Sequence, residues 1–268
     1  MGALSDLSAE LISLIVDYLH DDRKALMACA LVSRIFVARP QAYLFEHIGL
    51  WIPDRGSETN TWGNTDAMRA YISSDPDGLL SYTRRLTVLL GTLTLTLPEH
   101  LEEILNHWVA FKNVRELRVR LFATHFVKDP TLPSRYFSHF QPTLRRLHLK
   151  TRLENPKDLI IFIAFFPALE EVSIEVLSPK PPSLPDSKPE GFDPDLLSPL
   201  RGSLVLREIR HENNFLMELA KVQVRYHILS IYDLTVWVGL QELITGCAPT
   251  LRVLNLSREA CELFSLRF

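Results

Sequence analysis

The segment Leu144–Lys150, LRRLHLK, decides how most of this chain folds. Its leucines stand at the first, fourth and sixth positions, so the last two lie on one face of a β-strand and the polar residues between them on the other. The pattern L-x-x-L-x-L recurs along the chain, complete or degraded. The other apolar sets are Leu86 and Val88; Val114, Leu117 and Val119; Leu169, Val172 and Ile174; Leu206 and Ile209; Leu229 and Ile231; and Leu251, Leu254 and Leu256. These segments predict seven strands.

Helical segments separate several of these strands. Pro98–Phe111, Pro156–Phe166 and Trp237–Cys247 each end shortly before an apolar strand segment. A helix that returns the chain to a strand of the same sense makes a parallel sheet, and stacked units bury one core that no unit has alone. We therefore predict an α/β fold, an irregular β/α solenoid with a parallel sheet over residues 83–268.

A proline-rich stretch at 178–199 interrupts the solenoid, because it cannot form a helix or an interior strand. Its proline-rich sequence could contact a partner, although a solvated loop is the simpler interpretation.

The first fifty residues follow a helical period instead. Ser8 is a good N-cap and Glu10 suits the first turn of a helix. One apolar face is predicted for Leu11, Ile12, Ile15, Val16 and Leu19. Leu14 lies away from that face, which indicates a helix packed on two sides, by the rest of the chain or by a partner.

Two further helices are expected in this region. Asp21 or Asp22 can cap a helix at 23–30, and Ser33 can cap a short third helix that carries Phe36. Pro40 should end or bend that third helix, because proline lacks an N–H and clashes with the preceding turn. A unit with so few residues has a marginal core of its own.

The ordered pattern Leu7-Ser8-x-Glu10-Leu11-x-x-x-Ile15-x-x-Tyr18-Leu19, then Leu31-Val32-Ser33-Arg34-x-Phe36, resembles an F-box. The continuation Tyr43-Leu44-Phe45-x-x-Ile48 is similar to the variant abundant in fungi. The usual Leu-Pro opening is Leu7-Ser8 here, and Phe36 stands where the family often has Trp. The strand segments resemble the degenerate leucine-rich repeats that follow the F-box in many such proteins.

This resemblance implies a non-catalytic substrate receptor of a cullin–RING (SCF-type) ubiquitin ligase. The F-box would bind the Skp-family adaptor and, through it, a cullin, while the repeats would hold a protein substrate. The adaptor contacts implied by the family pattern are Leu7, Ser8, Leu11, Ile15, Leu19, Leu31, Val32 and Phe36. The alternative is a repeat scaffold without a ligase role, whose N-terminal helices only cap the solenoid. Solvent exposure of the helical apolar residues would favour docking, and their burial would favour capping.

Three regions are expected on this basis. Residues 1–50 would form the helical docking domain, residues 51–82 a connecting loop with a short helix at 66–72, and residues 83–268 the solenoid.

Composition is that of a folded protein, with 47% apolar residues and a formal net charge of -3. The charge gives no reason to expect nucleic-acid binding. Three distant cysteines and no visible signal peptide indicate reduced thiols in the cytoplasm or nucleus and not a secreted protein. Its most apolar segment, 159–169, is too short to span a membrane.

Motifs for phosphate loops, zinc proteases and serine hydrolases are absent from the sequence. We therefore expect no enzyme activity, cofactor or metal. His100 and His107 lie on one predicted helix, where an exposed polar face explains them better than a metal site.

Basic residues gather on two neighbouring predicted strands, at Arg115, Arg118, Arg120, Arg145, Arg146 and Lys150. Alternation would place Arg118, Arg120, His148 and Lys150 on one sheet face, a candidate surface for an acidic or phosphorylated substrate segment. The alternative, which we favour from sequence, is ordinary solvated strands balanced by Glu116, Glu170, Glu171 and Glu175.

Overall fold

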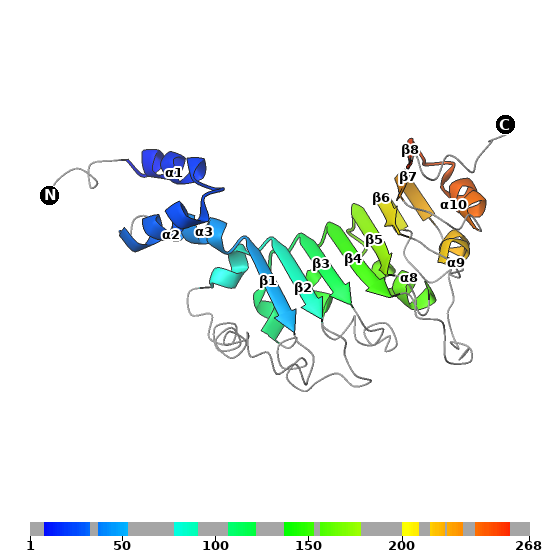
Figure 1. Ribbon diagram of the computed structural model, residues 1–268, viewed down its shortest axis with the longest axis horizontal. Coiled ribbons are helices and arrows are strands. Elements are labelled where there is room, and N and C mark those ends of the chain that lie inside the picture. The colour runs from blue at the N-terminus through cyan, green and yellow to red at the C-terminus, as the bar shows by residue number, and fades with distance from the viewer. Residues whose placement is uncertain are drawn as a thin grey trace.

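The chain forms three N-terminal helices followed by one open, eight-stranded parallel sheet (Figure 1). The computed structural model describes residues 8–32, 37–52, 78–90, 107–121, 137–152, 156–177, 200–208, 215–222, 224–232 and 239–257. The spatial order of the strands is their order in the chain, and each pairs in parallel with the next. This arrangement confirms the predicted α/β class and the parallel sheet.

The strands are β1 (His47–Ile52), β2 (Arg85–Leu90), β3 (Glu116–Leu121), β4 (Arg146–Arg152), β5 (Glu171–Leu177), β6 (Leu200–Arg207), β7 (Val224–Tyr232) and β8 (Val253–Leu256). Strands β2 to β5, β7 and β8 coincide with predicted segments, whereas β6 begins earlier than the fifth predicted segment, which was Leu206 and Ile209, and ends at Arg207; Ile209 lies outside the described residues. The predicted strand at 47–52 is β1, and it opens the same sheet, so the sheet begins before the expected boundary at residue 83.

The connections on the core side are the 3₁₀ turns η2 (Leu79–Tyr82), η3 (His107–Ala110) and η4 (Ser138–Phe140) and the helices α8 (Pro156–Ala164), α9 (Phe215–Lys221) and α10 (Leu240–Cys247). Helix α8 matches the prediction. Of the helix expected at 98–111, the described part is only the 3₁₀ turn, and α10 begins at Leu240, after Gly239 in a left-handed conformation (φ 84°). The short helix expected at 66–72 and the proline-rich stretch at 178–199 lie outside the described residues.

A repeated hydrogen-bond pattern joins the first five strands, from β1 to β5. One carbonyl just before a strand accepts two N–H groups from the start of the following unit, at 2.8–3.0 Å. The four acceptors are the carbonyls of Glu46, Arg84, Arg115 and Arg145. Because backbone atoms fix this step, the units keep one register although the sequence between them varies in length.

The core lies along one face of the sheet, where the turns and helices cover it. An aromatic group fills its centre, with ring centroids of Trp108 and Phe137 5.1 Å apart and those of Phe137 and Phe162 5.4 Å apart, both edge to face. Such pairs stabilise a core beyond the area they bury. The L-x-x-L-x-L positions of β3 and β4 are buried in the same cluster, as their spacing predicts.

One glycine sits where a side chain cannot fit. Gly202 has a φ of 93°, and a Cβ built there would lie 2.1 Å from the carbonyl oxygen of Glu170. The register between β6 and β7 shifts between Gly202 and Ser203. The strand therefore changes direction here by using a backbone conformation that favours glycine.

The N-terminal helices are α1 (Ala9–Tyr18), α2 (Arg23–Val32) and α3 (Ala38–Leu44). Ser8 caps α1 by accepting from the Leu11 N–H at 3.3 Å, and Asp22 accepts from the Ala25 N–H at 3.0 Å, so these two predicted caps are confirmed. The third helix begins at Ala38 without a side-chain cap, and the predicted cap Ser33 lies outside the described residues. The small core of the N-terminal helices consists of Ile12, Val16 and Leu26.

The prediction for Pro40 was wrong. Pro40 is the third residue of α3 and is buried, and the helix continues for a further turn to Leu44. The first residues of a helix have no carbonyl one turn back to bond, so a missing N–H costs nothing at this position.

Candidate interaction surfaces

Helix α1 has two apolar faces, and only one of them is covered by the described chain. Ile12 and Val16 are buried against the small core. On the other face, the exposed fractions are 50% for Leu11, 64% for Leu14, 45% for Ile15 and 89% for Tyr18. These four follow the i, i+3, i+4, i+7 spacing, so they form one continuous apolar strip, which we call the α1 strip. The single apolar face predicted for Leu11, Ile12, Ile15 and Val16 is thus divided between core and solvent.

Helix α2 also presents apolar side chains to solvent. Met27 and Leu31 are four residues apart and both exposed, and Val32 at the helix end is exposed as well. Exposed apolar side chains at helical spacing are typical of a surface that a partner covers.

The adaptor residues implied by the family pattern divide into three groups. Leu11, Ile15, Leu31 and Val32 are exposed, while Leu19 is half-buried against the small core. Ser8 serves as the cap of α1. Leu7 and Phe36 lie outside the described residues.

An ion pair holds α1 against α3. The Arg39 guanidinium donates from Nε and Nη2 to the two carboxylate oxygens of Asp17, both at 2.8 Å. The Tyr43 hydroxyl donates to the same carboxylate at 2.8 Å. Bonds from Arg39, and then from Tyr43, hold the pKa of Asp17 below its ordinary value. The tie fixes the orientation of α1 and therefore of its open strip.

Helix α3 in turn packs on the start of the sheet. It contacts η2, and the buried Thr83 donates from its hydroxyl to the Phe45 carbonyl at 3.0 Å. The three helices are thereby anchored to the first strands through α3, which leaves the α1 strip uncovered.

The second surface is the sheet face opposite the core. Alternate residues of neighbouring strands form rows across it, since all strands are parallel and in register. One row runs Arg85, Glu116, Arg146, Glu171 from β2 to β5, and the next runs Thr87, Arg118, His148, Ser173. The predicted set of Arg118, Arg120, His148 and Lys150 does lie on this one face, as alternation requires.

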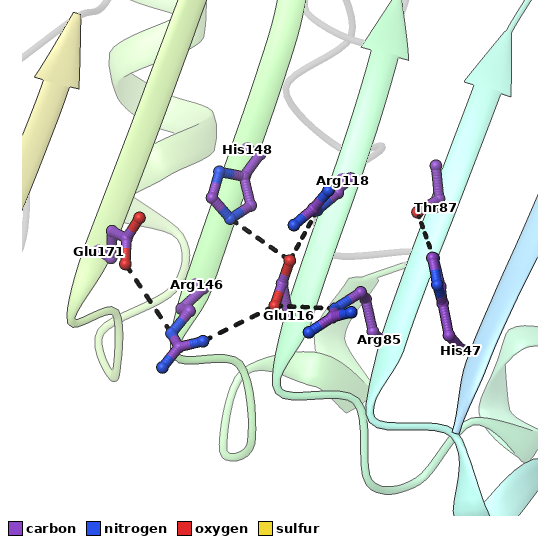
Figure 2. Close-up of polar contacts among 8 residues, drawn as sticks. All are labelled: His47, Arg85, Thr87, Glu116, Arg118, Arg146, His148 and Glu171. Carbon is purple, nitrogen blue, oxygen red and sulfur yellow. Dashed lines mark hydrogen bonds and ion pairs between the residues drawn. The ribbon is translucent and has the colours of Figure 1, made fainter. Parts of the chain in front are cut away.

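Glu116 is the centre of a cluster on this face, which we call the Glu116 cluster (Figure 2). Its side chain is only 8% exposed. Its carboxylate accepts from Arg118 Nε at 2.6 Å and from Arg85 Nε at 3.1 Å. Arg146 Nη1 lies 3.8 Å and His148 Nε2 3.5 Å from the same carboxylate. Three guanidinium groups thus surround one buried carboxylate.

The electrostatics of the Glu116 cluster follow from burial and charge. Burial acts to raise the pKa of Glu116, but the bonds from Arg118 and Arg85 outweigh it, so the pKa is lowered and the carboxylate stays charged. Burial lowers the pKa of His148, against the opposite effect of Glu116, so the ring is mainly neutral at pH 7. The positive charge of the cluster therefore rests on its three arginines.

The neighbouring strand limits this positive surface. Lys150 forms an ion pair with Glu175, and Arg146 Nε lies 3.8 Å from Glu171. Some of the acidic residues that were expected to balance the basic face therefore do so, namely Glu171 and Glu175 on β5.

Two members of the Glu116 cluster were missed as functional residues from sequence. Arg85 was not included in the basic group, and Glu116 was interpreted only as a balancing surface charge. The signal was present, because Arg85, Glu116, Arg146 and Glu171 each immediately precede the apolar-x-apolar pair that ends the strand pattern, namely 86/88, 117/119, 147/149 and 172/174. Aligning the strands on those positions would have placed the four charges in one row.

Within the described ranges no three His, Cys, Asp or Glu side chains come together as a metal site would require. No helix in that part of the chain is long and apolar enough to cross a membrane. The side chain of His107, and all of His100, fall outside the described residues.

No protein-family model matches the chain, and no curated protein matches it significantly.

Proposed function

We propose that this protein is a non-catalytic substrate receptor of a cullin–RING ubiquitin ligase, with α1 and α2 docking on the Skp-family adaptor and the open sheet face holding a protein substrate. The observation that carries the proposal is the α1 strip. This helix buries Ile12 and Val16 yet exposes four large apolar residues on its other side. Covering those residues with a partner would remove apolar surface from water and lower the free energy. The F-box resemblance identifies the class of partner.

Anchoring supports the same function. The tie between Asp17 and Arg39 and the packing of α3 on η2 connect the docking helices to the sheet. A receptor needs such a connection, because it must hold the substrate in a fixed position relative to the ligase. The chain itself would supply binding surfaces and no bond chemistry.

The test is a pull-down of the purified chain with a Skp-family adaptor, beside a Leu11→Asp, Ile15→Asp double variant. Both side chains are exposed, so the variant should fold normally and lose adaptor binding by at least about a hundredfold, since apolar anchors supply most of an interface's affinity. Val109→Asp is the matched control, because Val109 is an equally exposed apolar residue on η3, and it should bind as the parent does.

A second candidate is the scaffold without a ligase role. The observation that favours it is that α3 packs directly on the first units of the sheet, as an end cap would. In that case the parent chain would not bind the adaptor, and the double variant would give the same result as the parent in every binding assay.

A further inference from the structure

The Glu116 cluster has donors that its own carboxylate does not use. Arg85 and Arg118 both bond Glu116 through Nε. In the part of the chain that the structure describes, no acceptor pairs with the Nη groups of these two arginines, whose side chains are 44% and 49% exposed. Their terminal N–H groups are therefore available to a ligand in solvent.

Glu116 fixes the arginines from beneath. An arginine side chain loses rotamer freedom when it binds a ligand, and that loss opposes binding. Here the bonds to a carboxylate that is 8% exposed already hold two guanidinium groups in place. Glu116 is thus a positioning residue that lowers the entropic cost of binding an anion.

The charge and the width of the Glu116 cluster together indicate which anion fits it. Three guanidinium groups and two carboxylates, Glu116 and the Glu171 that lies against Arg146, leave one net positive charge on adjacent strands. Strands are spaced about 4.8 Å apart, so Arg85 on β2 and Arg146 on β4 flank a site about 10 Å wide. A phosphoryl group, with a charge near -2 and three acceptor oxygens, is opposite in sign to the cluster and offers one oxygen to each guanidinium group.

We propose that the Glu116 cluster binds a single phosphoryl group carried on an extended segment of a partner protein, with Arg85, Arg118 and Arg146 donating to its oxygens. This inference rests on the proposed function only in taking the open sheet face as the substrate surface, and it does not require the adaptor.

Nucleic acid fits this surface less well. A nucleic acid presents a regular row of phosphates and needs an extended basic stripe. On this face the positive charge is interrupted at β5, where Glu171 and Glu175 lie beside Arg146 and Lys150 and separate them from Arg207 on β6. The net charge of the whole chain is -3. A lone phosphoryl group would meet only Glu171, beside Arg146, whereas a polyanion that runs along the face would also meet Glu175.

The experiment uses the full chain and an array of individual short peptides, each with one phosphoserine and different flanks, beside the same array without phosphate and with Asp in place of phosphoserine. The best phosphopeptide is then measured by fluorescence polarisation. We expect phosphorylation to tighten its binding at least about tenfold, since each new charge-assisted bond is stronger than a neutral one. Inorganic phosphate should compete at high concentration.

Two variants test the assignment to the cluster. Arg118→Gln removes the closest donor to Glu116, and thermal unfolding checks that this variant folds. Arg146→Ala is the second variant, used if Arg118→Gln is unstable, because the Arg146 side chain lies 3.8 Å from Glu116. Each should weaken phosphopeptide binding about tenfold. The matched control is Arg207→Ala, because Arg207 is an exposed arginine on the same sheet face in β6, and it should leave binding unchanged.

The inference is overturned if no peptide prefers its phosphorylated form, if Asp replaces phosphoserine without loss, or if a folded Arg146→Ala variant binds as the parent does. Competition by an oligodeoxythymidine as effective as that by the phosphopeptide would also reject it, in favour of a nucleic-acid surface. The Leu11→Asp, Ile15→Asp variant should keep phosphopeptide binding. Loss of adaptor binding alone therefore counts against the proposed function and not against this site.

Discussion

The N-terminal helices and the sheet use their apolar residues in opposite ways. The small core of the helices has three buried members, whereas the sheet and its covering elements share one continuous cluster from β1 to α10. Of the twelve exposed large apolar side chains in the described residues, seven lie on α1 and α2. The sheet region buries most of its apolar side chains in its own core, with Val253 and Leu254 of β8 among the exceptions, while α1 and α2 leave most of theirs exposed.

The two regions also differ in how they display charge. On the open sheet face the charged residues pair across strands, with Glu116 at the centre of three arginines. On α1 the one firm ion pair, between Asp17 and Arg39, faces α3 and leaves the apolar strip free of charge. The molecule therefore has two surfaces of different chemistry, an apolar one on α1 and α2 and a charged one on the open sheet face.

The comparison predicts that the sheet is one cooperative unit. Phe137→Ala removes a fully buried ring that contacts Trp108 and Phe162, and it should lower the free energy of unfolding by about 4 kcal/mol. Chemical denaturation followed by tryptophan fluorescence measures this, because Trp108 lies in the affected core.

Val16→Ala is the counterpart in the helices. It should raise hydrogen exchange in α1 while the midpoint of sheet unfolding stays as in the parent, since the core of Ile12, Val16 and Leu26 is separate. A lower midpoint of sheet unfolding after Val16→Ala would show that the helices and the sheet unfold together, which would contradict the separation of the two cores.

A backbone change should act within the sheet alone. Gly202→Ala places a Cβ against the Glu170 carbonyl at a φ of 93°, and both strain and overlap should cost about 3 kcal/mol. Gly49→Ala is the control, because nothing lies within 4 Å of a Cβ at that position on β1. Thermal unfolding of both variants separates backbone strain at β6 from any general effect of glycine replacement, and equal melting temperatures would contradict the strain.

Sequence reasoning succeeded where local periodicity determines the structure. The alternation of Leu147, His148 and Leu149 fixes which side chain faces the core, whatever the loops do. It failed where the outcome depends on register between strands, so the Glu116 cluster was seen as scattered surface charges. Pro40 was misjudged because the helix start was placed before residue 37, which turned a tolerated first-turn proline into an interior one.

The smallest change in the free energy of unfolding is expected for a substitution on the charged sheet face, and this change depends on pH. Glu116→Gln removes the charge that Arg118 and Arg85 bond, at a cost of about 2 kcal/mol near pH 7. The pKa of Glu116 is lower in the folded than in the unfolded chain, so its contribution is present above about pH 4.3 and disappears as pH falls through the folded value. Urea unfolding of parent and variant from pH 7 to pH 3 should show the difference constant at first and shrinking below about pH 4.3. A difference that grows on acidification would contradict the charged state of Glu116.

The strict neighbour order of the strands has an evolutionary consequence. Each strand pairs only with the one before and the one after it in the chain, and the first five strands do so through the same backbone step. Duplication or deletion of one unit would lengthen or shorten the open face by one strand spacing, about 4.8 Å, without rearranging the rest. The span of the open sheet face would therefore change in fixed increments while the N-terminal helices stay as they are.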